Sequence, residues 1–99
     1  MFLVRDIMHC KPGKARPMVE KFVALSKVTQ PMGFGAMRVM TDVSGERFWT
    51  VIAEVEVADL GEYATQSRKA MDTKELKDIM KDYHDLVESG RREIYMLEK

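Results

Sequence analysis

The chain has 99 residues, of which 45% are hydrophobic and 32% are charged. This size and composition are typical of one folded domain, here residues 1–99. The 16 basic residues are balanced by 16 acidic ones, which argues against nucleic-acid binding and against attraction to an anionic membrane.

The first half of the chain predicts a strand, a helix and a hairpin. Five apolar residues lie within 2–10, before a Lys-Pro-Gly-Lys turn, and predict the first strand. Apolar residues then recur every three or four positions over 14–29, which predicts a helix. Two strands are expected at about 34–42 and 47–57, joined by a tight connection in which Gly45 takes a positive φ.

The strand at 47–57 alternates in polarity and so predicts two different faces. One face would carry Trp49 and four aliphatic residues, Val51, Ala53, Val55 and Val57. The other would carry Phe48, Thr50, Ile52, Glu54 and Glu56. The first face suits a covering of helices, and the second is half apolar.

The second half predicts two helical stretches and a last strand. Capping-box spacing at 59–62 and again at 72–75 marks the two helix starts. The second stretch is expected to carry an apolar stripe as far as Val87 and to stop at Gly90. Residues 91–98 then form the final strand.

This order predicts an α+β, ferredoxin-like β-α-β-β-α-β domain with a four-stranded antiparallel sheet in the order 4-1-3-2. Helices cover only one face of such a sheet. Because the other face is too apolar to stand free in water, we expect a second copy to pack against it, sheet to sheet, in a homodimer.

Two segments carry a resemblance to known families. Residues 5–14, Arg-Asp-Ile-Met-His-Cys-Lys-Pro-Gly-Lys, resemble the first strand and turn of the NIPSNAP family. Residues 33–56 resemble the central hairpin of that family and of the antibiotic biosynthesis monooxygenase family. The chain is therefore similar to the dimeric α+β barrel superfamily over nearly its whole length. Members include haem-degrading and quinol or polyketide monooxygenases, and proteins that bind small molecules or have no known activity.

The resemblance suggests His84, in the second-half helical region, as an axial haem ligand. The haem-degrading members also use an asparagine near the first strand and a tryptophan in the helix after the third strand. The chain has neither, and Tyr63 is the only bulky aromatic residue of that helix. We therefore expect no cofactor, and favour His84 as a partly exposed helix residue.

His9 is a candidate general base, because a histidine titrates near neutral pH. A purely structural role is the alternative. His9 and Cys10 are adjacent in a strand and point to opposite faces, and no Cys/His pair has zinc spacing, so we expect no metal site.

Arg5 and Asp6 place two charges in the middle of a central strand, where one of them must face the helices. A buried charge requires a partner. Pairing with Arg38 or Glu54 would form either a polar floor for a substrate, with Asp6 as a base, or an ion pair that fixes the register of the dimer.

Aromatic side chains complete the candidate site. Phe48 and Tyr63 are candidate substrate contacts, whereas Trp49 is expected to pack in the core with the valines.

Two functions remain open from the sequence. The first is a monooxygenase-like enzyme acting on a small aromatic or hydrophobic molecule, in a pocket between helices and sheet or inside the barrel. The second is a non-catalytic, homodimeric module that binds a ligand or a partner.

We expect a cytoplasmic protein without membrane contact. The single cysteine cannot form an internal disulfide, which fits a reducing compartment. The early charges at Arg5 and Asp6 argue against a signal peptide.

Overall fold

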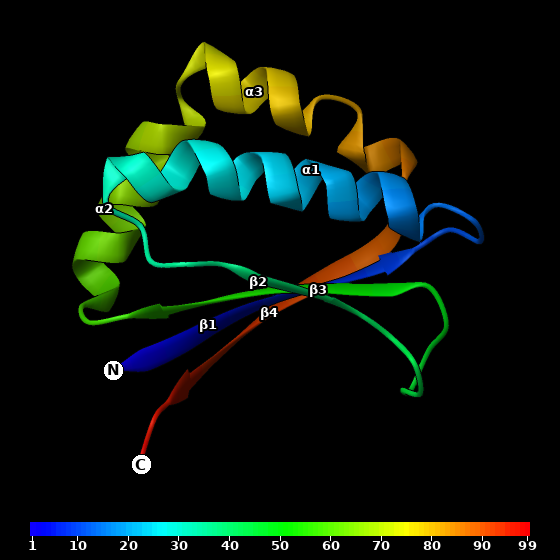
Figure 1. Ribbon diagram of the computed structural model, residues 1–99, viewed down its shortest axis with the longest axis horizontal. Helices are drawn as coiled ribbons and strands as arrows, with labels where there is room; N and C mark the ends of the chain where they lie inside the picture. Colours follow the sequence, from blue (N-terminus) through cyan, green and yellow to red (C-terminus); the bar gives the residue numbers. More distant parts are fainter.

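A computed structural model describes residues 1–99 and shows one antiparallel sheet covered on one face by helices (Figure 1). The strands are β1 (Phe2–Cys10), β2 (Arg38–Thr41), β3 (Thr50–Val57) and β4 (Val87–Met96). Their order in the sheet is β2-β3-β1-β4. The α+β, ferredoxin-like fold and the expected strand order are thereby confirmed.

Three α-helices and two short 3₁₀ turns connect the strands. The helices are α1 (Ala15–Thr29), α2 (Leu60–Met71) and α3 (Lys74–Met80), and the turns are η1 (Gln30–Met32) and η2 (Tyr83–Asp85). The cap expected at Asp59 is present, since its side chain accepts a hydrogen bond from the backbone N–H of Glu62. The second cap lies one residue later than expected, because Thr73, and not Asp72, accepts from the backbone N–H of Leu76. No helix combines the length and apolar composition needed to span a membrane.

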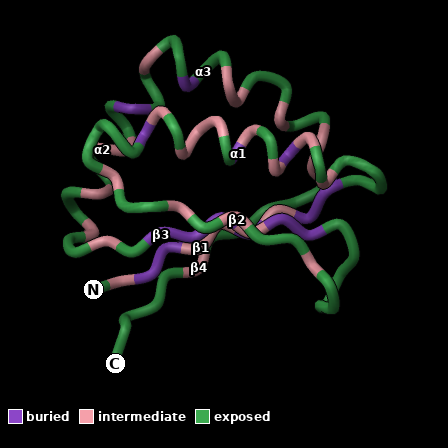
Figure 2. Tube along the Cα trace, in the orientation of Figure 1, coloured by how far each residue is buried: buried purple, intermediate pink, exposed green.

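The core lies between α1 and the middle of the sheet. Met18 and Phe22 of α1 pack with Cys10, Val51 and Ala53 of the two central strands. In Figure 2 the buried segments follow β1, β3 and the sheet-facing side of the helices, whereas β4 is exposed over most of its length. The face of the sheet away from the helices has no covering layer in this chain (Figure 1).

The expected helix through Val87 is wrong. Helix α3 ends at Met80, and Asp82 adopts a left-handed conformation with φ of 64°, which redirects the chain into η2. Gly90 does not stop a helix; it lies inside β4, where a Cβ atom would stand 2.8 Å from the Sδ atom of Met8. The glycine therefore makes room for a neighbouring side chain.

The expected hairpin is also wrong in detail. β3 begins at Thr50, and residues 42–49 form a longer connection in which Gly45 does not have a positive φ. Trp49 has that conformation instead, with φ of 61°, which breaks the alternation of the strand. As a result Trp49 is 43% exposed and Phe48 is 83% exposed, and neither packs on the sheet as expected.

Candidate functional site

The candidate residues of β1 lie on opposite faces of the sheet. Asp6 lies on the helix-covered face with Val4 and Cys10, whereas Arg5 and His9 lie on the open face. One charge of the Arg5-Asp6 pair therefore does face the helices. The two faces form separate sites, one between sheet and helices and one on the uncovered side.

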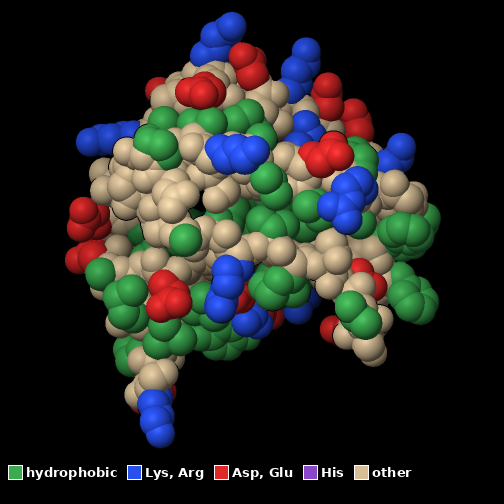
Figure 3. Space-filling view, in the orientation of Figure 1, with side chains coloured by type: hydrophobic (Ala, Val, Ile, Leu, Met, Phe, Trp, Pro, Cys, Tyr) green, Lys and Arg blue, Asp and Glu red, His purple; other side chains and the backbone are tan.

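Between the sheet and the helices lies a cavity of about 110 Å³. Its walls are mainly apolar and come from all three helices, the segment before β2, and the sheet. The lining residues are Asp6, Phe22, Leu25, Thr29, Phe34, Gly35, Met37, Val55, Tyr63, Ser67, Ala70, Met71, Leu76 and Arg92. Figure 3 shows hydrophobic side chains at the junction between the helical layer and the sheet, with charged side chains on the outer surface of the helices.

An ion pair forms the polar wall of this cavity. Arg92 of β4 donates from Nε to Oδ1 of Asp6 at 2.7 Å and from Nη2 to Oδ2 at 3.1 Å. This two-point contact raises the pKa of Arg92 above its ordinary value. The guanidinium carbon of Arg92 lies 6.0 Å from the ring centre of Tyr63, which meets the ring of Phe34 edge-on at 6.0 Å.

The open face carries a row of paired charges across the sheet. Glu54 lies opposite Arg38 on one side and Arg5 on the other. Its side chain is only 4% exposed and accepts hydrogen bonds from both arginines, at 2.9 Å from Nε of Arg5. Glu93 of β4 continues the row next to Arg5. Of the partners expected for the two charges of β1, Arg5 pairs with Glu54, whereas Asp6 pairs with Arg92 and with neither Arg38 nor Glu54.

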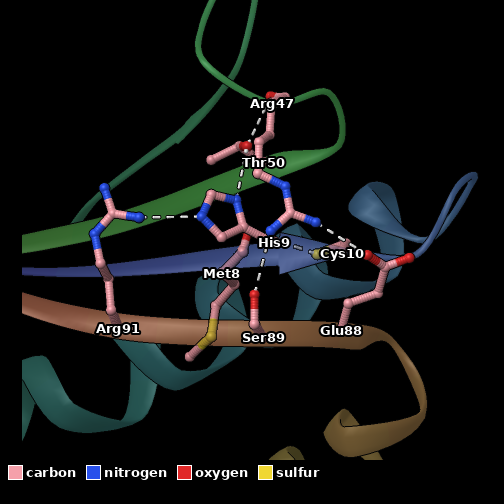
Figure 4. A network of polar contacts seen from close by, with 8 residues as sticks. All are labelled: Met8, His9, Cys10, Arg47, Thr50, Glu88, Ser89 and Arg91. Atoms are coloured by element: carbon pink, nitrogen blue, oxygen red, sulfur yellow. Dashed lines mark hydrogen bonds and ion pairs between the residues drawn. The ribbon is translucent and has the colours of Figure 1, made fainter.

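His9 lies on the same face, near the connection between β2 and β3 (Figure 4). Its ring lies between Thr50, with Nδ1 at 3.3 Å from Oγ1, and Arg91, with Nε2 at 3.1 Å from Nη1. Burial, followed by the charges of Arg47 and Arg91, lowers the pKa of His9 below its ordinary value of 6.5. The imidazole is therefore neutral at pH 7.

His84 and Phe48 lie apart from both sites. His84 is in η2, not in a helix, and is exposed, with its ring 4.0 Å from that of Tyr83. It borders a surface groove along β4 that Asp6 also reaches, but it makes no hydrogen bond or ion pair. Phe48 lines a different groove, together with Trp49 and the start of α1.

These positions do not fit a haem site. His84 does not line the apolar cavity, which is in any case far smaller than a four-ring porphyrin. The groove beside His84 is bordered mostly by polar and charged residues, which suit a porphyrin face poorly.

Sequence reasoning missed several residues that form these sites. Arg91 and Arg92 were placed in the last strand without partners, although the alternation of β4 puts one on each face of the sheet. The strand expected to start at about residue 34 begins only at Arg38, so Phe34 precedes the sheet and lines the cavity. The two arginines of the last strand could have indicated these pairs, because they are polar residues in a strand adjacent to β1. That signal can be used only when the register between β1 and β4 is known.

No family model matches the sequence, and no curated protein is significantly similar to it. Solved structures, in contrast, match nearly the whole chain. An uncharacterised NIPSNAP-like domain protein from Burkholderia xenovorans superposes with a TM-score of 0.83 and 16% identity, over 99% of this chain and 85% of its own. A NIPSNAP family protein from Agrobacterium tumefaciens gives a TM-score of 0.83 and 16% identity, over 96% and 90%.

The chain has the fold of the NIPSNAP-like proteins. An antibiotic biosynthesis monooxygenase also shares this fold, with a TM-score of 0.72 and 12% identity over the full length of both chains. The expected structural resemblance to both groups is confirmed. At such low identities the NIPSNAP-like fold is what the proteins share, and function has to be argued from the site.

Proposed function

We propose that this protein binds a small hydroxylated aromatic molecule in the cavity between the sheet and the helices, and that it does so as a homodimer. The observation that carries the proposal is a partly open, mainly apolar space with one hydrogen-bonding wall, formed by Asp6 and Arg92. Ligand sites of this kind combine an apolar lining with a few polar groups that orient the ligand.

The size of the cavity supports a molecule with one ring. An engineered apolar cavity of roughly 150 Å³ in another protein stays dry and binds benzene. The cavity here is of comparable size, at about 110 Å³. Phe34 and Tyr63 provide aromatic edges against which such a ring packs.

The polar wall supports an uncharged ligand with a hydroxyl group. Asp6 and Arg92 already neutralise each other, so a charged ligand would find no free counter-charge at this wall. A hydroxyl group can donate to a remaining lone pair of Asp6 without breaking the two bonds from Arg92.

A monooxygenase-like reaction is the activity that we propose for this site. Hydroxylated aromatic rings are electron-rich and can supply electrons to oxygen themselves, so the protein needs only to orient and deprotonate them. The antibiotic biosynthesis monooxygenase with the same fold supports this choice. A ligand-binding module without catalysis is the alternative. It is favoured by the full pairing of Asp6 with Arg92, which leaves no free base in the cavity.

The homodimer is supported by the open face of the sheet. Ile52 is half-buried and Met40 is 38% exposed on this face, beside Ile7, which neighbouring side chains already bury. The charges between them alternate in sign from strand to strand, so the same face of a second copy can meet them with opposite charges.

Calorimetric titration with phenol and with anisole, which lacks the hydroxyl donor, tests the binding. We expect phenol to bind more tightly than anisole, and Asp6→Asn to reduce this difference. Ala70→Leu fills the cavity and should abolish binding, whereas Ala64→Leu, on the exposed side of the same helix, should not. Equal binding by Ala70→Leu would refute the site.

The activity is tested separately with an oxygen electrode and a dihydroxybenzene. If the protein consumes oxygen, and this activity is lost in Ala70→Leu but retained in Ala64→Leu, the result supports a monooxygenase-like enzyme. Binding of the dihydroxybenzene without oxygen consumption supports a ligand-binding module without catalysis.

A further inference from the structure

A second pocket lies on the open face, beneath the connection between β2 and β3, with a volume of about 440 Å³. Its floor is apolar and consists of Ile7, Ile52 and Met40. Its rim carries Arg5, His9 and Arg91, with Glu93 beside them; residues 41–47 and Thr50 complete the lining. This pocket is separated from the helix–sheet cavity by the sheet itself.

Hydrogen bonds determine which nitrogen of His9 carries the proton. The hydroxyl of Thr50 donates to the carbonyl oxygen of Arg47 at 2.9 Å, so it can only accept from the histidine. Nδ1 of His9 is therefore the donor, at 3.3 Å from Oγ1. Nε2 is left as an acceptor, and it receives an N–H of Arg91 at 3.1 Å. Figure 4 shows the ring between these two partners.

Two guanidinium groups at this pocket have donors that no protein group uses. Arg5 bonds to Glu54 through Nε alone, so neither of its Nη groups has a protein partner. Arg91 donates through Nε to Glu93 and through Nη1 to His9, which leaves Nη2 free. Planar guanidinium groups with free N–H donors are suited to carboxylates.

We propose that this pocket binds a small carboxylic acid, with its carboxylate on Arg91 and Arg5, its apolar chain on Ile7 and Ile52, and proton uptake by Nε2 of His9 coupled to binding. All of these residues belong to one chain, so the pocket requires neither the aromatic ligand nor the homodimer. In a homodimer, the second copy would cover the pocket on its open side.

The coupling follows from the charges around His9. Arg47 and Arg91 favour the neutral imidazole, whereas Glu46 and Glu88 favour the protonated one. A bound carboxylate offsets the charge of Arg91 and draws its Nη1 group away from Nε2. Both changes favour protonation of His9, and by linkage the acid binds more tightly as the pH falls from 7 towards 5.

The test is a titration with butyrate, followed by NMR of the histidine side chains. The chain has two histidines, so a His84→Ala variant assigns the signal of His9. We expect saturable binding and an upward shift in the pKa of His9 as butyrate is added. The uncharged analogue butyramide should give neither.

Arg91→Gln should weaken butyrate binding by about tenfold or more, as expected when a charged hydrogen-bond partner is lost. Arg68→Gln, an exposed position on α2 without an ion pair, is the matched control and should bind normally. Should Arg91→Gln fail to fold, Arg91→Lys retains the charge and should give an intermediate loss. A His9 signal that does not respond to butyrate, or unchanged binding by the Arg91 variant, overturns the proposal.

Discussion

Arg5 and Glu54 lie directly opposite each other on the two central strands, with Nε of Arg5 2.9 Å from Oε2 of Glu54. Glu54 also accepts from Arg38, so a single carboxylate compensates two arginines. Because Glu93 lies next to Arg5 on β4, the charge alternates in sign across all four strands. This row is a patterned part of the open face and not a set of isolated surface charges.

Replacing Glu54 by alanine should destabilise the fold. The substitution leaves Arg5 and Arg38 close together without a counter-charge. Loss of one partner of a fully buried ion pair costs about 3–5 kcal/mol. Because the Arg38 side chain is 65% exposed, we expect a loss of about 2 kcal/mol in the free energy of unfolding, measured by urea denaturation. Glu56→Ala, on the same face but exposed and unpaired, should change it by less than about 0.5 kcal/mol.

Ile52→Asp should dissociate the proposed homodimer. Ile52 lies opposite Ile7 and Met40 on the open face, so the variant places a charge in the layer between two sheets. Light scattering should give the mass of one chain, with the circular dichroism of the folded protein retained. Val23→Asp, on the exposed side of α1, should keep the mass of two chains. If Ile52→Asp also keeps it, the open face is not the interface.

The stability of the protein should fall when the pH drops below about 6.5. His9 has a lower pKa in the folded chain than in the unfolded one, so between these two values the unfolded chain binds more protons. Its contribution to stability is complete above pH 6.5 and is lost as the pH falls through the folded value. His9→Gln should flatten this part of the curve of unfolding free energy against pH, whereas His84→Gln should not. An unchanged slope in His9→Gln would mean that another group causes it.

Haem should give no absorption change that depends on His84. The residue is exposed in η2 and does not line the apolar cavity. Titration of the protein and of His84→Ala with haem, followed in the Soret region, should give the same weak response. A stoichiometric shift present only in the unmodified protein would contradict this and reopen the haem interpretation.

The sequence was sufficient for the layout of the fold because its strongest patterns are local. The strand at 2–10, the helix at 14–29 and the two capped helix starts each follow from periodicity or capping within a few residues. The split between Arg5 and Asp6 also follows from alternation alone. These elements are enough to indicate the order of the sheet.

Other features depend on contacts between distant residues and were not predictable in this way. Gly90 has the sequence context of a helix end, but it lies in β4, where the side chain of Met8 on the adjacent strand occupies the space beside its Cα atom. Trp49 fits the alternation of a strand, but its left-handed backbone places it in the preceding connection. The arginine partners of Asp6 and His9, on β4, are 86 and 82 residues away, so both sites depended on the register of β1 and β4.

The position of β4 at the edge of the sheet has a consequence for the behaviour of the chain in concentrated solution. The backbone donors and acceptors of β4 that point away from β1 form an unpaired row, and Ile94, Tyr95 and Met96 are exposed along this strand. Such an edge is a template on which another unpaired strand can add. The consecutive charges Arg91, Arg92 and Glu93 directly precede this apolar run and disfavour that pairing. The arginines that form the two sites therefore also make the edge less suited to pairing with another strand.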